Sequence, residues 1–222
     1  MLKILIKFPS RERPEQFRKA LTQYAAKASD LKNIHFLFTL DSDDKTIDAY
    51  TRIIENSGVE NTTVIGVSTG KIDAVNRDLN DFLKGHNPDI ILLASDDMIP
   101  ISNGYDRIIR DKAEELGLDR VFWFHDSNQA RLNTLCILGI EYYKRFNYLY
   151  HHSYKSLWCD NEFHEIALRL EKMNKVPYDV IIEHQHPLHN RKYQMDELYK
   201  KNDVHWTVDM DNFNKRKSLN FQ

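Results

Sequence analysis

The sequence predicts an α/β fold in which a mostly parallel, twisted sheet carries helices on both faces. Short apolar runs, typical of strands, alternate along the chain with stretches of helical length, which is the pattern of βαβ units. The run Ile90–Ala94 is apolar at every position, as expected for a central strand buried on both faces. A chain of 222 residues is long enough for one globular domain with a sizeable core but is short for two.

Strands are expected where apolar and β-branched residues gather between polar, turn-forming residues. They are Leu2–Phe8, Ile34–Leu40, Thr62–Val67, Ile90–Ser95, Val121–Phe124, Thr134–Leu138 and Val180–Glu183. The helices expected between and after them are Pro14–Ala28, Ile47–Asn56, Ile72–Leu83, Asn103–Leu116 and Trp158–Glu171. Gly58, Gly85 and Pro88 supply stop signals after two of these helices.

The regular alternation loosens beyond about Ile140. The following region is rich in Tyr and His, and we expect it to hold an acceptor. The polar tail from about Lys192 is expected to be partly irregular or to wrap over the site.

The composition sets limits on the class of protein. Lys and Arg total 31 against 33 Asp and Glu, so the net charge of -2 gives no global attraction to nucleic acid or to an anionic membrane. The two cysteines, Cys136 and Cys159, have no CxxC spacing, which indicates reduced thiols. No apolar run approaches the roughly 18 residues of a membrane span. These features predict a soluble, cytoplasmic protein with no membrane span.

Two adjacent carboxylates, Asp96 and Asp97, follow the apolar strand that begins at Ile90. Ligands of open α/β sheets gather at the carboxyl ends of the strands. Neighbouring like charges are costly unless a cation neutralises them, and carboxylate oxygens suit Mg²⁺ or Mn²⁺ that carries the phosphates of a substrate. The alternative is that these residues open a turn or cap a helix.

Four polar motifs follow strands or begin helices in a particular order. They are Pro9-Ser10-Arg11, Asp41-Ser42-Asp43-Asp44, Thr69-Gly70-Lys71 with Asn76-Arg77, and Ser95-Asp96-Asp97. Over residues 1–186 this order resembles family 2-like nucleotide-sugar glycosyltransferases of the GT-A fold. The resemblance implies a single GT-A-like domain over residues 1–222. Residues 1–139 would then bind the nucleotide sugar, and residues 140–222 would form the acceptor-binding and catalytic half with a C-terminal tail.

In that family, the loop after the first strand and the acidic turn after the second embrace the nucleoside. The matching positions are Pro9, Arg11, Asp41 and Asp43. A carboxylate there can accept a hydrogen bond from a uracil N–H or a ribose hydroxyl. The alternative for Arg11 is a surface charge.

Lys71 matches the phosphate-binding position of the family. It opens a predicted helix, so backbone N–H groups, the helix N-terminus and an ammonium group could converge on one anion. Arg77 lies six residues further on and would also contact the nucleotide sugar, although a solvated helix face is its alternative.

The resemblance also implies a metal site. Asp97 would bind Mn²⁺ or Mg²⁺ directly, while Asp96 would contact the sugar or ribose. Members of the family complete the metal sphere with a late histidine, which His184 or His186 resembles, and we favour His186. The alternative is that both histidines are packed, hydrogen-bonded residues.

The segment Trp158-Cys159-Asp160-Asn161-Glu162 stands where the family places its acidic catalytic motif. Asp160 is the first candidate for the base that deprotonates the acceptor, and Glu162 is the second. Trp158 is a candidate acceptor-binding platform. Alternatively, Asp160 caps the helix and Glu162 interacts with the helix dipole.

The resulting prediction is a metal-dependent, inverting glycosyltransferase that moves a sugar from a nucleoside-diphosphate donor, UDP-linked, to the hydroxyl of a glycan or other acceptor. One alternative acceptor is a hydroxymethylated base in DNA, with phosphate contacts from the basic segments Arg191-Lys192, Lys200-Lys201 and Lys215-Arg216-Lys217. A nucleotidyltransferase is another alternative, although the loop Phe8–Arg13 lacks the glycines usual in that class. A non-catalytic nucleotide-binding module is the third.

Overall fold

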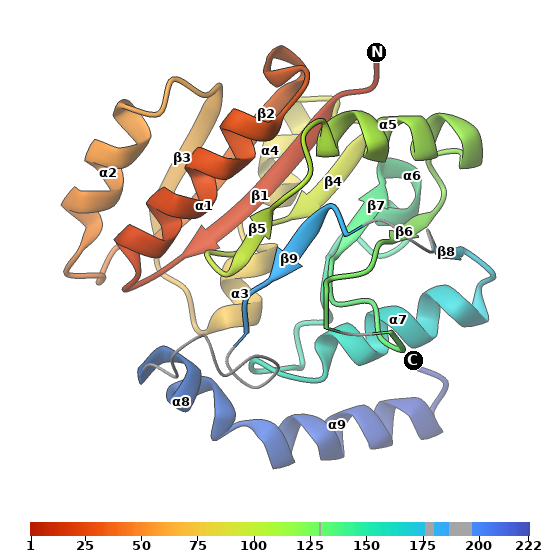
Figure 1. The fold of residues 1–222 in the computed structure, drawn as a ribbon. Helices are drawn as coiled ribbons and strands as arrows, with labels where there is room; N and C mark the ends of the chain where they lie inside the picture. Colours follow the sequence, from red (N-terminus) through yellow and green to blue (C-terminus); the bar gives the residue numbers. More distant parts are fainter. Residues whose placement is uncertain (129, 176–179, 187–196) are drawn as a thin grey trace.

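The computed structural model describes the chain except for residues 129, 176–179 and 187–196 (Figure 1). Its described strands form a seven-stranded sheet in the order β3-β2-β1-β4-β7-β6-β8. These strands are β1 (Ile4–Ser10), β2 (Ile34–Asp41), β3 (Asn61–Gly66), β4 (Ile90–Leu93), β6 (Val121–Trp123), β7 (Ile137–Gly139) and β8 (Met173–Lys175). A separate antiparallel pair consists of β5 (Met98–Pro100) and β9 (Ile182–His184).

The helices follow the strands as predicted over the first half of the chain. They are α1 (Pro14–Lys27), α2 (Ile47–Glu55), α3 (Lys71–Asn76), α4 (Leu79–Gly85), α5 (Tyr105–Leu116), α6 (Ile140–Tyr143), α7 (Cys159–Arg169), α8 (Glu197–Asp203) and α9 (Trp206–Ser218), and a short 3₁₀ helix spans Leu31–Asn33. No helix in the described part of the chain is long and apolar enough to cross a membrane.

The half of the sheet that comes first in the chain is parallel. Ile4 of β1 lies beside Ile34 of β2 on one side and beside Ile90 of β4 on the other, and β3 extends the parallel order beyond β2. The predicted α/β class with a mostly parallel sheet is therefore confirmed. β7 runs antiparallel to both β4 and β6, which the sequence pattern did not predict. The described residues between β6 and β7 form no helix, and a connection without a crossover helix suits an antiparallel pair.

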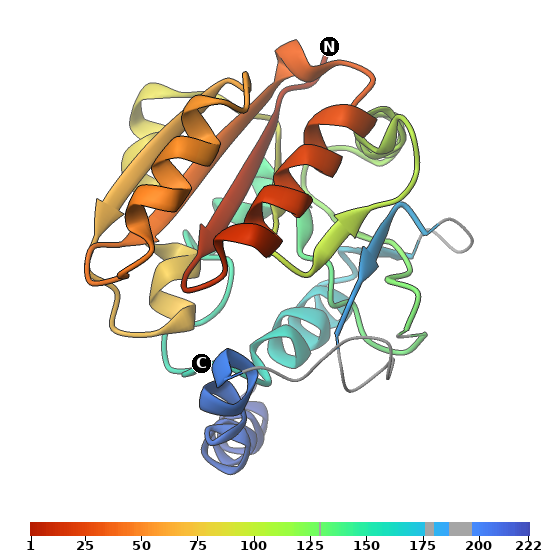
Figure 2. The same ribbon diagram turned by 60° about the vertical axis from the view of Figure 1, so that its left-hand side comes forward.

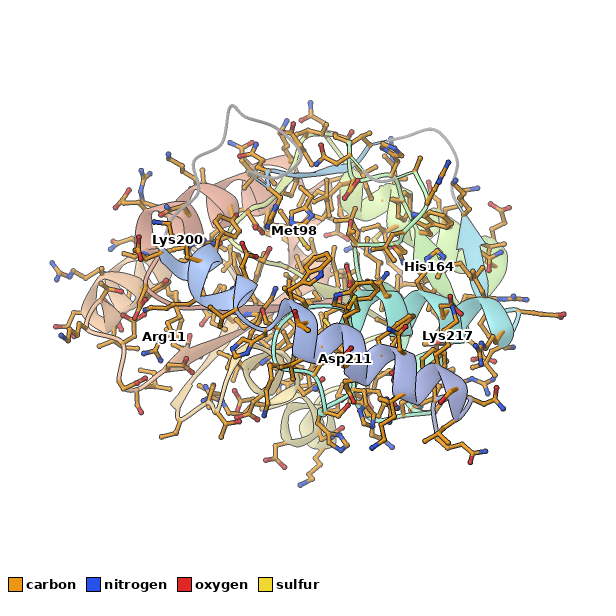
Figure 3. All side chains as sticks on the ribbon, turned by 90° about the horizontal axis from the view of Figure 1, so that it is seen from below. Arg11, Met98, His164, Lys200, Asp211 and Lys217 are labelled. Atoms are coloured by element: carbon orange, nitrogen blue, oxygen red, sulfur yellow. The ribbon has the colours of Figure 1, made fainter. Side chains whose placement is uncertain are left out.

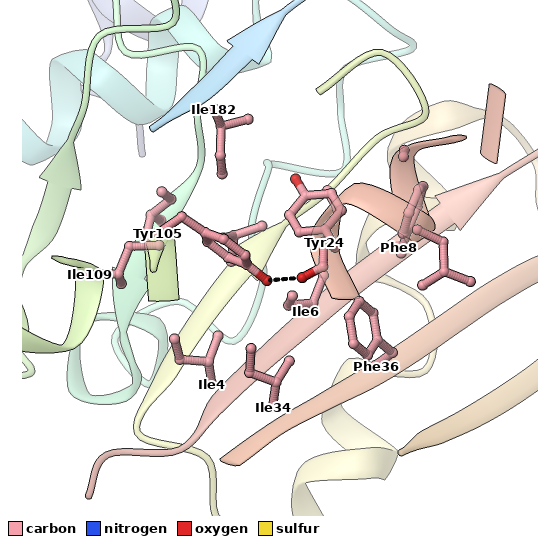
Figure 4. Close-up of a cluster of buried hydrophobic side chains, with 14 of the residues drawn as sticks. Ile4, Ile6, Phe8, Tyr24, Ile34, Phe36, Tyr105, Ile109 and Ile182 are labelled. Carbon is pink, nitrogen blue, oxygen red and sulfur yellow. Dashed lines mark hydrogen bonds between the residues drawn. The ribbon is translucent and has the colours of Figure 1, made fainter. Parts of the chain in front are cut away.

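Alternate residues of the central strands face two different helix layers. Ile4, Ile6 and Phe8 belong to a core cluster with α1, α2 and α5, whereas Leu5 belongs to a cluster with α3, α4, α6 and α7. Figure 2 shows α1 and α2 side by side over one face of the sheet. Figure 4 shows the first cluster, in which the Tyr105 hydroxyl donates to the carbonyl of Tyr24 at 3.2 Å. The period of two along each strand thus produces a three-layer arrangement.

Two predicted segments differ from the structure. The single helix expected from Ile72 to Leu83 is wrong, because the chain leaves helical geometry at Arg77 and Asp78 and starts again as α4. The tail was expected to be partly irregular or to wrap over the site; its residues 197–203 and 206–218 form α8 and α9, and Tyr199 of α8 contacts Asp97. The few apolar residues of α9 do not form a clear stripe along one face of the helix, so its helical periodicity was difficult to detect from the sequence.

Helix α9 is attached to the segment around α7 by two buried carboxylates. Asp209 is fully buried and accepts hydrogen bonds from three successive backbone amides, those of residues 155–157, at 2.8–2.9 Å. Arg216 donates to both oxygens of Glu162 at 2.7 and 2.9 Å. α9 therefore fixes the loop that leads into α7 and the first turn of that helix.

Candidate functional site

The parallel half of the sheet brings the predicted motifs to one edge. The loop after β1 carries Arg11, β2 ends at Asp41, and the turn after β4 contains Asp96 and Asp97. The turn is closed by a hydrogen bond from the amide of Met98 to the carbonyl of Ser95 at 3.1 Å. Since carboxyl ends of parallel strands share an edge, three motifs distant in sequence become neighbours.

The Asp97 carboxylate is held by hydroxyl donors and a histidine. Ser95 donates to Oδ1, and Tyr199 of α8 donates to Oδ2 at 2.7 Å. His184 Nε2 lies 3.6 Å from the same Oδ2. Burial acts to raise the pKa of Asp97, but the charge of His184 and the two hydroxyl donors outweigh it and hold that pKa well below its usual range. Asp97 is therefore an ionised, ligand-competent carboxylate.

Asp96 has a different environment although it is adjacent in sequence. Arg13 donates to its Oδ1 at 3.0 Å, and Ser10 donates to its Oδ2 at 3.1 Å. Burial, followed by the negative charge of Asp97, raises the pKa of Asp96 to about 6 even though Arg13 opposes the shift. The two neighbours are thus separated into a strongly ionised group and one that ionises closer to neutral pH.

His184 lies between two acidic side chains. Its Nε2 faces Asp97, and its Nδ1 is 3.7 Å from Oδ2 of Asp126, too far for a hydrogen bond. Burial acts to lower the pKa of His184, but the carboxylates of Asp97 and Asp126 raise it to about 9. Asp126 is itself fixed by the hydroxyl of Thr134, which donates at 2.5 Å.

Asp97 and His184 fit one side of a cation site, at which a cation would displace the proton that His184 holds at neutral pH. In the described residues, no three His, Cys, Asp or Glu side chains are grouped closely enough to hold a metal ion. Two donor atoms 3.6 Å apart can nevertheless both lie about 2.1 Å from one ion. Where Mg²⁺ binds together with a phosphorylated ligand, it is often held by one or two protein side chains, and phosphates and waters complete its coordination sphere. The two residues therefore suit a cation that is shared with a phosphorylated ligand.

His186 lies with its ring next to the rings of His184 and Tyr199. Its ring centroid is 5.5 Å from that of His184 and 4.7 Å from that of Tyr199, and its amide donates to the carbonyl of His184. Sequence reasoning favoured His186 as the metal ligand, whereas the geometry favours His184. Pro187, which follows, lies outside the described residues.

The predicted nucleoside-binding residues lie together. Arg11 donates to Asp41 at 3.0 Å and to both oxygens of Asp43 at 2.5 and 3.0 Å. The hydrogen bond from Arg11 lowers the pKa of Asp43. Pro9 is paired with Thr39 of β2 in the parallel register and precedes this cluster. Asp41 is buried and Asp43 is exposed, so the cluster reaches from the sheet edge to the surface.

Arg77 joins the same cluster from the opposite side. Its guanidinium donates to the carbonyl of Leu40 and to the hydroxyl of Ser68, both at 2.9 Å, and Nη1 lies 3.6 Å from Oδ1 of Asp41. It also covers Gly66, where an added Cβ would lie 3.2 Å from Nη1. The guanidinium is therefore fixed across the ends of β2 and β3.

Lys71 and Asp160 interact electrostatically although they are far apart in sequence. Burial raises the pKa of Asp160, and the positive charges of Lys71 and, more weakly, His184 oppose that shift. Asp160 is thus a carboxylate within electrostatic reach of both the phosphate-binding candidate and the cation-binding candidate. The helix that Lys71 opens is only six residues long, and Asp73 in its first turn accepts a hydrogen bond from the amide of Thr69.

Glu162 points to a different set of partners. Residues two apart on a helix face nearly opposite directions, so Asp160 and Glu162 cannot share one face of α7. Glu162 is buried and accepts hydrogen bonds from Tyr154 at 2.7 Å and from Arg216. Glu162 therefore connects α7 with α9, and Asp160 is left as the candidate for the catalytic base.

Trp158 packs against α9. It has a left-handed backbone conformation, with φ of 61°, directly before α7. Its ring centroid is 5.4 Å from those of Trp206 and Phe213. Its indole nitrogen is buried and has no hydrogen-bond partner among the described residues.

Sequence reasoning missed Arg13 and Tyr199. Arg13 is buried against Asp96, and its guanidinium lies 4.1 Å from the centre of the Tyr199 ring. Figure 3 shows α8 and α9 crossing the lower face of the molecule, with Lys200 on the same side as Arg11. Lys201 of α8 pairs with Glu12 at 3.0 Å. The contacts of α8 with Arg13 and Glu12 are visible only in the folded chain, because more than 180 residues separate the partners in sequence.

The protein also has a groove away from this edge of the sheet. Its volume is about 730 Å³, and it is lined by residues of α1 and of α2 with the turn that follows it, among them Leu21, Ala25 and Ile53. It contains none of the predicted site residues. The chemistry of the sheet edge, and not cavity size, identifies the candidate site.

Comparison with known proteins identifies the fold. No protein-family model and no curated protein matches the sequence. Solved structures do match. The mannosyltransferase PcManGT from Pyrobaculum calidifontis, in complex with GDP-Man and Mn²⁺, has a TM-score of 0.59 and 13% identity, covering 82% of this chain and 56% of that one.

Staphylococcus aureus TarS 1-349 matches with a TM-score of 0.62 and 13% identity over 84% of this chain and 61% of that chain. In complex with UDP-GlcNAc, it matches with a TM-score of 0.62 and 12% identity over 90% and 64%. The chain thus spans less than two thirds of each of these structures. At such low identity the similarity shows the fold alone, and the chain has a GT-A-like α/β fold.

Proposed function

We propose that this protein is a metal-dependent, inverting glycosyltransferase that moves a sugar from a UDP-linked donor to an acceptor hydroxyl. The observation that carries the proposal is the approach of His184 to the ionised Asp97 at the end of β4. This pair lies at the sheet edge where α/β proteins bind ligands. Placement in family 2 remains part of the proposal, as does the division into a donor-binding half, 1–139, and an acceptor-binding half, 140–222.

The donor would lie along the sheet edge. Pro9, Arg11, Asp41 and Asp43 would surround the nucleoside, and a carboxylate among them would accept from the uracil N–H or a ribose hydroxyl. The existing ion pairs of Arg11 would be exchanged for contacts with the ligand.

The diphosphate and sugar would lie nearer to α3 and β4. Lys71 would supply positive charge toward the diphosphate, Arg77 would contact the nucleoside end of the donor from beside Asp41, and Asp96 would contact the sugar or ribose. The neighbours solved with GDP-Man and Mn²⁺ and with UDP-GlcNAc support this class of donor.

Asp97 and His184 would hold Mn²⁺ or Mg²⁺. Bound there, the cation would stabilise the negative charge of the leaving nucleoside diphosphate. Tyr199 donates to the Asp97 oxygen that faces His184, so this hydroxyl competes for the same lone pairs.

Asp160 is the proposed base. Inversion requires a group that accepts the proton of the acceptor hydroxyl on the face opposite the leaving group. Burial raises the pKa of Asp160, which makes its carboxylate a stronger proton acceptor than an exposed aspartate. Glu162, the second candidate, is occupied by Arg216 and Tyr154.

A glycan or another small hydroxyl acceptor is favoured over DNA. Four residues of the basic segments of the DNA hypothesis pair with acidic side chains: Lys200 with Glu197, Lys201 with Glu12, Arg216 with Glu162 and Lys217 with Glu165. Arg191 and Lys192 lie outside the described residues. Trp158 remains the proposed acceptor platform, through the part of its ring that α9 leaves uncovered.

The function is tested by a thermal-shift screen of UDP-, GDP- and TDP-sugars with and without Mn²⁺, followed by a nucleotide-release assay. We expect stabilisation by a UDP-sugar only with the metal. Asp160→Asn should keep donor affinity and lose turnover. Donor binding without any release of UDP in the presence of varied acceptors would instead identify a non-catalytic nucleotide-binding module, and pyrophosphate release from a nucleoside triphosphate would identify a nucleotidyltransferase.

A further inference from the structure

A lysine is buried in the middle of the sheet, beneath the break between α3 and α4. Lys7 lies on β1 between Leu37 of β2 and Leu93 of β4, and its side chain is fully buried. Its ammonium group donates to the hydroxyl of Thr39 and, at 2.7 Å, to the carbonyl of Arg77. A buried ammonium group is costly unless several acceptors hold it. This position is therefore expected to serve a purpose beyond packing.

One acceptor of Lys7, the carbonyl of Arg77, lies where the predicted helix breaks. Arg77 leaves helical geometry with φ and ψ of -52° and 144°, and Asp78 adopts the left-handed conformation with φ of 74°. For a residue other than glycine, this conformation is strained. Lys7 binds the carbonyl that the break releases. The carboxylate of Asp78 accepts from Thr39 at 2.7 Å and lies 4.0 Å from the ammonium group of Lys7.

The break determines the direction of the Arg77 side chain. From this backbone position its guanidinium reaches the carbonyl of Leu40 and the hydroxyl of Ser68 and approaches Asp41. A continuous helix would rotate the Arg77 backbone and move the guanidinium away from the ends of β2 and β3. The contact with Asp78, at 3.3 Å from Nε, further fixes the side chain.

From this geometry we propose that Lys7 is a positioning residue: it holds the α3–α4 break and thereby places Arg77 at the nucleoside end of the donor site. Lys7 is too deeply buried to contact a ligand, so it acts only through Arg77 and its neighbours. The inference rests on the proposed function, because it assigns Arg77 a contact with the bound donor.

The depressed pKa of Lys7 agrees with this position. Burial lowers that pKa to about 7, while Asp78 acts to raise it and Arg77 to lower it. Asp78 and Arg77 are the charged groups that face the Lys7 ammonium group from the α3–α4 junction. The neighbours of Lys7 on β2 and β4 are uncharged: Leu37, Thr39 and Leu93.

The test is a double-mutant cycle on UDP affinity in the presence of Mn²⁺, measured by calorimetry. Lys7→Met removes the ammonium group and Arg77→Met removes the guanidinium. We expect each single variant to weaken UDP binding about tenfold, as for loss of one charge-assisted hydrogen bond. The double variant should be no weaker than either single one, because both act through one group. Lys3→Met, at an exposed position near the start of the same strand, is the matched control and should bind as wild type.

Two results would overturn the inference. The first is an unchanged UDP affinity in Lys7→Met. The second is that Lys7→Met weakens UDP binding by the same factor in the wild-type protein and in Arg77→Met, which lacks the guanidinium. If Lys7→Met fails to fold, Thr39→Val takes its place in the cycle, since it removes the hydroxyl that links Lys7 with Asp78 while keeping the side-chain volume.

Hydrogen exchange separates this inference from the proposed function. Lys7→Met should accelerate amide exchange in α3 and α4 but not in α1, whether or not a nucleotide binds. Unchanged exchange in α3 and α4 would refute the positioning role by itself. Failure of the wild-type protein to bind any nucleotide with Mn²⁺ would refute the proposed function, and the role of Lys7 in holding the break would then be decided by exchange alone.

Discussion

Replacing Asp209 by alanine should destabilise the protein and impair the step assigned to Asp160. Asp209 lies on α9, and its carboxylate accepts from the amides of Lys155, Ser156 and Leu157 at 2.9, 2.8 and 2.8 Å. It is fully buried, so water cannot readily replace it. The loop that it holds leads directly into α7 and Asp160.

The magnitude follows from the three amides that the substitution leaves without an acceptor. Each unsatisfied buried amide costs about 1–3 kcal/mol. Taking the low end of this range for each of the three amides, we expect a loss of about 3 kcal/mol. For a chain of this length, about 2 °C of melting temperature is lost per kcal/mol, which gives a decrease of about 6 °C.

The assay combines thermal unfolding with nucleotide release. Asp209→Ala should unfold about 6 °C below wild type and release UDP more slowly at a temperature where it is fully folded, since the loop before Asp160 is no longer fixed. Asp211→Ala, at an exposed position on the same helix, is the control (Figure 3). A melting temperature within about 1 °C of the control would refute the reasoning, because such a difference corresponds to less than about 1 kcal/mol and is on the order of the measurement error.

Three further predictions concern single contacts. Tyr199→Phe removes the hydroxyl that competes for Oδ2 of Asp97, so Mn²⁺ should bind about tenfold more tightly by calorimetry; unchanged or weaker binding would contradict this competition. Arg216→Met leaves the buried charge of Glu162 without its cation and should lower the free energy of unfolding by about 3 kcal/mol in urea titrations; a change below about 0.5 kcal/mol would show that the pair is not structural. The pKa of Lys7 is lowered to about 7 from 10.5, so the unfolded chain binds more protons between those pH values, and wild type should gain stability over Lys7→Met as the pH rises through that window; a constant difference in unfolding free energy would contradict it.

The parallel half of the fold was predictable because each element has a local pattern. The apolar run from Ile90 predicted a central strand, and Asp96 and Asp97 at its end predicted the candidate site. The confirmed α/β class follows from this alternation of strands and helices.

Other features depend on contacts between distant segments, which no local pattern contains. Arg13 resembles a surface charge in sequence, yet it is buried against Asp96 and Tyr199. The break at Asp78 was missed because the apolar spacing of residues 72–83 suits one helix, while the groups that stabilise the break, Lys7 and Thr39, come from other strands. The preference for His184 over His186 likewise required the position of β9 beside β5.

The central proposal is that Asp97 binds a cation that is shared with the donor diphosphate. The most direct measurement is a calorimetric titration of UDP with and without Mn²⁺ on wild type, Asp97→Asn and the control Asp111→Asn, whose side chain is exposed on α5. We predict that Mn²⁺ tightens UDP binding at least about tenfold in wild type and in the control and has no effect in Asp97→Asn. Equal Mn²⁺ dependence in all three proteins would contradict the account.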